Sequence, residues 1–92
     1  MSTVYRRNAA IEASPMQGEA LLFDPATNRF CLLNATAALV WDRLQQPLTA
    51  QQLAAEVSRH FDGPAPAQVE QDVLAALQRF TELALVAPEN VA

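Results

Sequence analysis

The chain has 92 residues, of which 51% are hydrophobic and 17% charged, so its composition is that of one globular domain and not of a disordered chain. The formal net charge is −4, with ten acidic residues against six basic ones, which disfavours binding to a phosphate backbone. The single cysteine excludes an internal disulfide and fits a reducing cytoplasm, and no stretch is long and apolar enough to suggest a membrane span.

The first third of the chain predicts a small antiparallel sheet. Apolar runs alternate there with segments rich in Pro, Gly, Asp and Asn, which favour turns. The expected elements are a tail at 1–8, strands at 9–13, 19–24 and 29–33, and turns at 14–18 and 24–28. In the last strand Phe30 and Leu32 point to one side. Cys31 and Leu33 point to the other, so this strand is apolar on both faces and needs cover on its second face.

After Asn34 the hydrophobic period changes to that of a helix, and three helices are expected. Asn34 is a suitable N-cap for the first, Thr49 and Gln52 match a capping box for the second, and Pro66 is a favoured first residue for the third. The expected inward-facing stripes are Ala37, Val40, Trp41 and Leu44, then Leu53, Ala54, Val57 and Phe61, then Val69, Val73, Ala76, Leu77, Phe80 and Ala84.

The predicted ends of the elements complete this picture. Pro47 ends the first helix, residues 62–64 end the second, and the third runs roughly to Leu83. A short closing strand is expected at 85–86, and Pro88 begins a tail. The order is β-β-β-α-α-α: a single α+β domain at 1–92, with its core at about 9–86 and three helices packed on one face of a three-stranded sheet.

Cys31 and His60 are the first residues to test for catalysis, because a thiol and an imidazole can form a nucleophile–base pair. Cys31, however, lies in mid-strand among large apolar residues, where a free cysteine usually acts as a small hydrophobic residue. His60 is expected at a helix end, where its charge suits the helix dipole. One His and one Cys do not supply three or four metal ligands. The sequence therefore predicts no catalytic residue, no metal and no cofactor.

Three segments together resemble the PqqD-like family. They are EALLFDPATNRFCLLNATAALVW at 19–41, TAQQLAAEV at 49–57 and VEQDVLAALQRFTELALV at 69–86. The shared features are a turn and strand ending in Leu-Asn, the following Thr-Ala, a Thr-capped second helix and Asp-Val in the third. That family contains the peptide chaperone of pyrroloquinoline quinone biosynthesis and the recognition element of many enzymes that modify ribosomally made peptides. One departure is residues 45–47 (Gln-Gln-Pro), which replace the usual Asp-Gly between the first two helices.

The resemblance implies a winged-helix-like domain that binds the leader of a precursor peptide. The leader would add as a strand to the edge of the third strand, in the groove between it and the third helix. The expected peptide-binding residues are Arg29, Phe30, Cys31, Leu32 and Leu33 on the strand, and Leu74, Leu77 and Thr81 on the helix. The implied partners are the precursor peptide and a peptide-modifying enzyme, with this chain a non-catalytic, cytoplasmic monomer or homodimer.

Two kinds of alternative remain open: that single residues have no role in binding, and that the fold has a different function. Leu74 reads equally well as an exposed leucine, and Arg29 as a solvated charge on an edge strand. A winged-helix nucleic-acid-binding or regulatory domain is the alternative function. Against it, Arg79 is the only basic residue of the third helix, beside Glu70, Asp72 and Glu82, and this balance repels phosphates.

Overall fold

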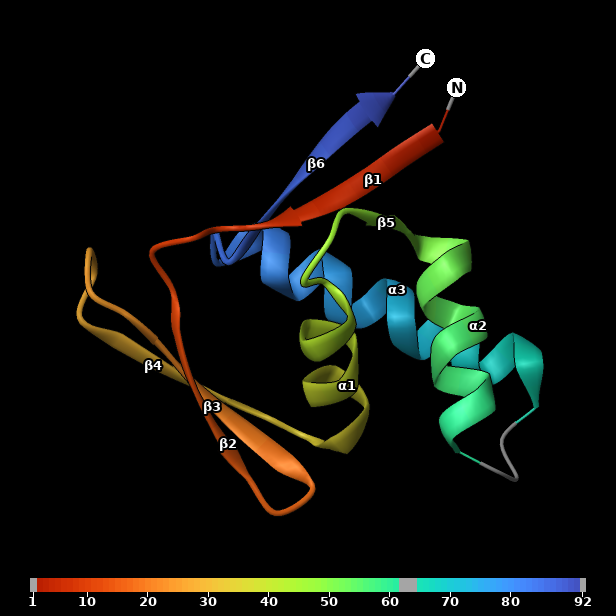
Figure 1. Ribbon diagram of the computed structural model, residues 1–92, viewed down its shortest axis with the longest axis horizontal. Helices are drawn as coiled ribbons and strands as arrows, with labels where there is room; N and C mark the ends of the chain where they lie inside the picture. Colours follow the sequence, from red (N-terminus) through yellow and green to blue (C-terminus); the bar gives the residue numbers. More distant parts are fainter. Residues whose placement is uncertain (1, 62–64, 92) are drawn as a thin grey trace.

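The computed structural model describes residues 2–61 and 65–91 and shows an α+β architecture with two small antiparallel sheets (Figure 1). The three helices gather between the sheets, with α1 beside the sheet β2-β3-β4 and β1 and β6 forming a ribbon that projects from the body. The elements are β1 (Ser2–Arg7), β2 (Glu12–Met16), β3 (Glu19–Asp24), β4 (Arg29–Leu33), α1 (Ala35–Arg43), β5 (Leu48–Thr49), α2 (Ala50–His60), α3 (Pro66–Glu82) and β6 (Val86–Val91).

The sheet β2-β3-β4 corresponds to the one predicted from the sequence, with its first strand displaced. Strands β3 and β4 have the expected bounds, but β2 begins at Glu12 and includes residues that were expected in the turn. Pro15 is compatible with this strand because β2 is an edge, where one side makes no ladder bonds. The turn is reduced to two residues, and Gly18 supplies the positive φ of 73°.

The second sheet, with the order β5-β1-β6, was not expected, and the prediction of a single sheet with a tail at each end is wrong. The N-terminal segment is β1, and the strand that follows α3 continues past Pro88 to Val91. The two pair antiparallel over six register positions. Arg6 Nε lies 3.2 Å from Glu89 Oε2, across a sequence separation of 83 residues. Local patterns miss such a pair because each strand gains its partner only when the fold brings the two termini together.

The helix starts agree with the caps predicted from the sequence. The side chain of Asn34 accepts a 2.9 Å hydrogen bond from Ala37 N at the start of α1. Thr49 and Gln52 form the full capping box of α2, with bonds of 3.1 and 2.8 Å. Pro66 is the first residue of α3. Helix α1 ends at Arg43, shortly before Pro47, and the predicted end of α2 at 62–64 lies outside the described residues.

The hydrophobic core lies between the helices and the inner faces of both sheets, and the three predicted stripes supply most of it. Ala54, Phe61, Ala37 and Ala76 pack against it half-buried. Its buried members are Ala20, Leu22, Leu33, Val40, Trp41, Leu44, Leu53, Val57, Val69, Val73, Leu77, Phe80, Leu85 and Val86. The exception is Ala84, which is exposed because the chain has left the helix by that point.

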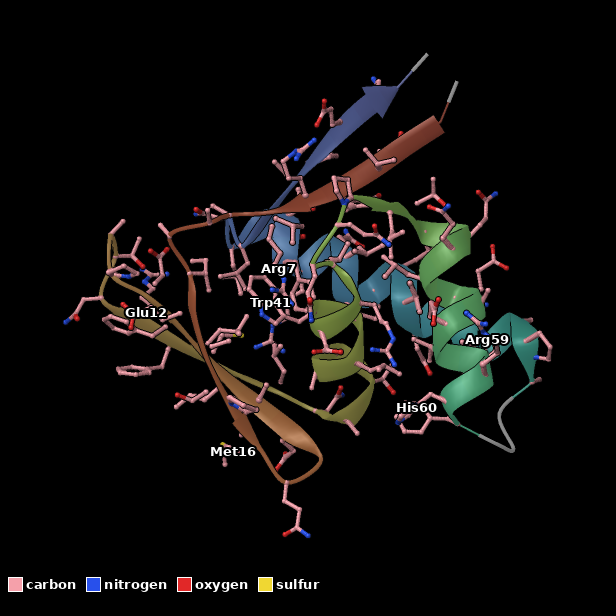
Figure 2. The ribbon with its side chains drawn as sticks, in the orientation of Figure 1. Arg7, Glu12, Met16, Trp41, Arg59 and His60 are labelled. Carbon is pink, nitrogen blue, oxygen red and sulfur yellow. The ribbon has the colours of Figure 1, made fainter. Side chains whose placement is uncertain are left out.

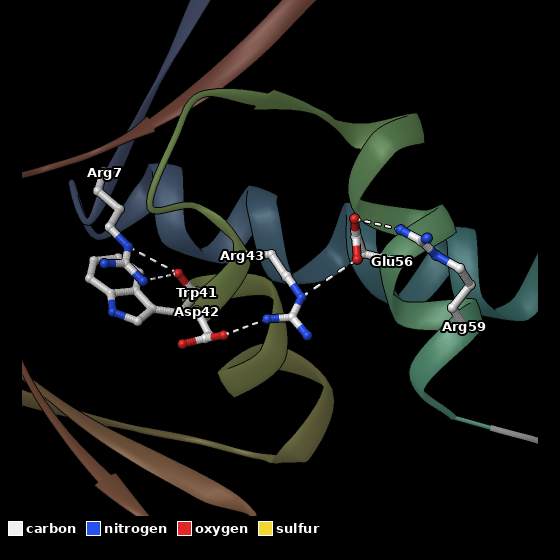
Figure 3. A network of polar contacts seen from close by, with 6 residues as sticks. All are labelled: Arg7, Trp41, Asp42, Arg43, Glu56 and Arg59. Atoms are coloured by element: carbon white, nitrogen blue, oxygen red, sulfur yellow. Dashed lines mark hydrogen bonds and ion pairs between the residues drawn. The ribbon is translucent and has the colours of Figure 1, made fainter.

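Trp41 belongs to the core, as predicted, with 4% of its surface exposed. Its ring meets Phe80 edge-on at 5.9 Å between centroids, and the guanidinium of Arg7 lies 4.6 Å from its centroid (Figure 3). Arg7 also donates from Nε to the carbonyl oxygen of Trp41 at 2.9 Å. Burial lowers the pKa of the Arg7 guanidinium, and the charge of Asp42 opposes this shift. Arg7 therefore ties β1 to α1, which gives the unexpected strand a structural role.

Ala84, the residue after the C-cap of α3, lies in the left-handed region with φ of 57°, and this is a strained conformation for a residue with a Cβ. Its amide and that of Leu85 donate back to the last turn, to Thr81 O at 3.1 Å and Phe80 O at 2.8 Å. Glycine is the usual residue at this C-terminal position. We expect Ala84→Gly to raise the free energy of unfolding by about 0.5–1 kcal/mol in a urea titration. An unchanged or lower stability would contradict this account of the helix end.

Candidate functional site

Strand β4 is the feature around which the candidate site is built. It lies at one end of the sheet β2-β3-β4 and pairs with β3 from Arg29 to Leu33. Among the described residues, no strand pairs with its outer side. An edge of this kind presents unpaired N–H and C=O groups that can template a further strand.

The other edges of the two sheets are less suited to accepting a strand. Strand β2 contains Pro15 and β6 contains Pro88, and proline has no N–H to offer. Strand β5 has two residues. Among the edge strands of the described residues, β4 therefore combines a length of five residues with the absence of proline, so it is the edge best suited to pair with a further strand.

The side chains of β4 alternate as the sequence predicts. Leu33 is buried and Cys31 half-buried, facing the core. Phe30 and Leu32 point the other way and are 67% and 54% exposed. The ring of Phe30 lies 4.7 Å from that of Phe23 on β3. One apolar face of the strand is thus covered by the protein and the other is open to solvent.

Two hollows lie between β4 and α3, and Arg79 lines both. The first, of about 320 Å³, adjoins the end of β4 and the start of α1, and the second, of about 490 Å³, adjoins the start of β4 and the end of α3. We call them together the β4–α3 groove. Its residues are Leu32, Leu33, Asn34, Thr36, Ala37, Asp72, Ala75, Ala76, Arg79 and Phe80 in the first hollow, and Leu22, Asp24, Thr27, Arg29, Phe30, Cys31, Arg79, Glu82, Leu83, Ala84 and Leu85 in the second.

The structure brings all five predicted strand residues to the groove but none of the three predicted helix residues. Leu77 is 1% exposed and belongs to the core. Leu74 lines a separate hollow with β1 and the start of α2. Thr81 is exposed, and its hydroxyl donates to Leu77 O at 2.8 Å, so it bonds back to its own helix. The groove wall was expected at these three positions, but in the structure the opposite flank of α3, with Ala75, Ala76 and Arg79, faces β4.

The physical reason is that a helix with one buried stripe has two flanks. At about 100° per residue, Leu74 is turned by about 100° from the buried Val73 in one direction, and Arg79 by about 120° in the other. The flank toward β4 carries Ala75, Ala76 and Arg79. The apolar character of Leu74 pointed to the wrong flank. Ala75 and Ala76 could not be recognised as groove residues from the sequence, because small side chains contribute to a groove by leaving space open.

Charges within the groove are mixed. Asp72 Oδ1 accepts from Gln68 Nε2 at 2.9 Å, and Asp24 Oδ1 accepts from the backbone of Ala26 at 3.0 Å. Within residues 2–61 and 65–91, Arg79 takes part in no ion pair or side-chain hydrogen bond. Arg79 thus has no ion-pair partner among the described residues, in a groove whose lining also carries Arg29 and the carboxylates of Asp24, Asp72 and Glu82.

Cys31 and His60 are placed apart. Cys31 lines the second hollow of the groove, whereas His60 ends α2 and lines a hollow with Met16 and Trp41. Figure 2 shows His60 at the end of α2. Among the described residues, no cluster of three or more His, Cys, Asp or Glu side chains could hold a metal ion. Nor does any helix in these ranges have the length and apolar character needed to cross a membrane.

Comparison with known families matches residues 19–86 to the model described as coenzyme PQQ synthesis protein D, PqqD. The chain belongs to the PqqD family. The matched region contains β3, β4 and all three helices, and hence both sides of the β4–α3 groove. The strands β1 and β2, by contrast, lie outside the matched region.

Solved structures similar to this PqqD-family chain extend the likeness to nearly its whole length. One, TbiB1 in complex with the TbiA(beta) leader peptide, is 17% identical with a TM-score of 0.78, covering 95% of this chain and 98% of the other. A second, lasso peptide synthetase B1 complexed with the leader peptide, is 21% identical with a TM-score of 0.76, covering 91% and 98%. These likenesses show the shared fold. No curated protein matches the sequence.

Proposed function

We propose that this PqqD-family chain is a non-catalytic peptide-binding protein. It captures the leader of a ribosomal precursor peptide by strand addition to β4 and presents the precursor to a modifying enzyme. The observation that carries the proposal is a free, proline-free edge strand bordered by a groove with two hollows, each lined by both apolar and polar side chains. Family membership supports it, as does the likeness to two proteins whose structures contain leader peptides.

The energetics of strand addition suit this groove. Main-chain hydrogen bonds to β4 supply affinity for any extended peptide, and alternate side chains that enter the hollows supply specificity. The peptide loses conformational freedom on binding, so we expect dissociation constants from nanomolar to micromolar, about −12 to −8 kcal/mol. The peptide would also continue the exposed apolar face of Phe30 and Leu32.

The proposal extends to the protein's wider setting. We place it in the cytoplasm as a single domain at 1–92, acting as a monomer or homodimer beside its enzyme. We also propose that the fold is winged-helix-like, as the family resemblance implies, but that it does not bind nucleic acid. Asp72 and Glu82 on the groove side of α3 would repel a phosphate backbone. Duplex DNA binding that weakens steeply with salt would favour the nucleic-acid alternative.

The test compares two tryptophan substitutions at neighbouring exposed positions of α3. Ala75→Trp fills the first hollow, and Leu74→Trp places the same side chain on the opposite flank. The probe is a fluorescently labelled peptide selected by the wild-type protein from a random dodecapeptide library. We expect Ala75→Trp to weaken its binding at least about 100-fold, because the bulky ring occludes the hollow, and Leu74→Trp to change it less than about threefold.

Backbone amide shifts on titration provide the second readout. We expect them to concentrate at Arg29–Leu33 and on the groove flank of α3, at residues 72–83. Shifts confined to α1 and α2 would rule out the groove model whatever the affinity. Equal binding by both tryptophan variants would rule it out as well.

A further inference from the structure

Arg79 holds the central position in the β4–α3 groove. It is the residue common to both hollows, and it also lines a third hollow with Ala75, Gln78, Glu82 and Leu83. On one side of it the lining includes Ala75, Ala76 and Leu32, and on the other Cys31 and Leu83. A peptide strand along β4 would therefore pass Arg79 between the two hollows, each of which combines apolar with polar side chains.

The charges around Arg79 differ in whether they already have partners. Asp72 accepts from Gln68, and Asp24 accepts from Ala26 N. Glu82 lines the second hollow, but among the described residues no carboxylate oxygen lies within ion-pair distance of Arg79. Arginine pairs with carboxylates through two parallel N–H···O bonds, and a bound peptide would remove water from around such a pair.

We infer that Arg79 reads an acidic side chain in the bound peptide. The inference rests on the proposed function and names the class of peptide that the groove selects. Successive side chains on one side of a strand are two residues apart. The preferred segment therefore has a Glu or Asp facing Arg79, with apolar residues two positions before and two positions after it entering the two hollows.

The experiment uses three synthetic ten-residue peptides that differ at one position. Each has leucine two residues before and two residues after a central Glu, Gln or Lys, with Ser and Thr elsewhere. We expect wild-type protein to bind the Glu peptide about tenfold more tightly than the isosteric Gln peptide, with the difference shrinking at high salt, and the Lys peptide to bind most weakly.

Variants of the protein assign this preference to one side chain. Arg79→Gln is expected to bind the Glu and Gln peptides equally, and Arg79→Glu to prefer the Lys peptide. The matched control is Arg59→Gln, which removes the same charge from α2 (Figures 2 and 3). Arg59 does not line the groove, and its Nη2 lies 2.6 Å from Oε1 of Glu56. This control should keep the full preference for Glu.

The outcomes separate this inference from the proposed function. Groove binding without a preference for Glu, or a preference that survives Arg79→Gln, would overturn the role of Arg79 and leave the peptide-binding function standing. Failure of all three peptides, while the library-selected peptide still shifts β4 and α3 amides, would overturn the spacing inferred here. If the library-selected peptide also fails to bind the groove, both proposals fall.

Discussion

Replacing Trp41 by alanine is expected to lower the free energy of unfolding by about 3–5 kcal/mol. The indole is almost fully buried, meets Phe80 edge-on and carries the guanidinium of Arg7 on its face. Alanine would leave a cavity in the core and remove the ring on which the Arg7 guanidinium stacks. Since small domains have total stabilities of about 5–15 kcal/mol, this change removes a large share of what holds the chain folded.

Urea titration followed by circular dichroism measures this loss. Trp41→Phe is the informative companion, because it keeps an aromatic ring near Phe80 and should recover part of the stability. A loss below about 1 kcal/mol for Trp41→Ala would show that the indole contributes little to the core. Arg7→Gln tests the link to β1 separately, since it removes the guanidinium above the ring and the donors to Trp41 O.

Leu77→Glu is expected to be more damaging still, with a loss above about 4 kcal/mol and little folded protein at 25 °C. Leu77 is 1% exposed among the side chains that α3 buries, so a carboxylate there would lose its water without gaining a partner. Leu74→Glu is the matched control on the same helix. Leu74 is 45% exposed, and its substitution should change stability by less than about 0.5 kcal/mol.

Peptide binding adds a second contrast to this pair. Because Leu74 lines a hollow with β1 and α2, away from β4, Leu74→Glu should leave groove binding unchanged. If a well-folded Leu74→Glu variant lost peptide binding, the result would support Leu74 as part of the groove wall, as first expected from the sequence. It would contradict the groove described here. A folded Leu77→Glu variant would contradict the placement of Leu77 in the core.

The groove and the core share Phe80. This residue is completely buried, contacts Trp41 and also lies at the bottom of the first hollow. Variants meant to probe binding are therefore best placed at exposed positions such as Ala75 and Arg79, where a change in affinity is not confused with a change in folding.

The amino-acid sequence by itself determined the local structure of this protein. Asn34, the pair Thr49 and Gln52, and Pro66 start the three helices where the sequence predicts them, because a cap bonds residues within one turn of itself. The 3.6-residue period of the helices likewise identified most of the residues they bury, and the two-residue alternation of β4 identified which of its side chains share a face. These signals need no information beyond a few neighbouring positions.

Tertiary structure decided what depends on distant parts of the chain. Strands β1 and β6 form because their backbone groups pair with each other across almost the whole sequence, so neither segment carries a complete signal alone. The sequence led to Leu74 rather than Arg79 as a residue of the groove wall for a similar reason. A helical period defines a buried stripe with two equivalent flanks, and only the packing of α3 beside the sheet makes one of them the wall of a groove.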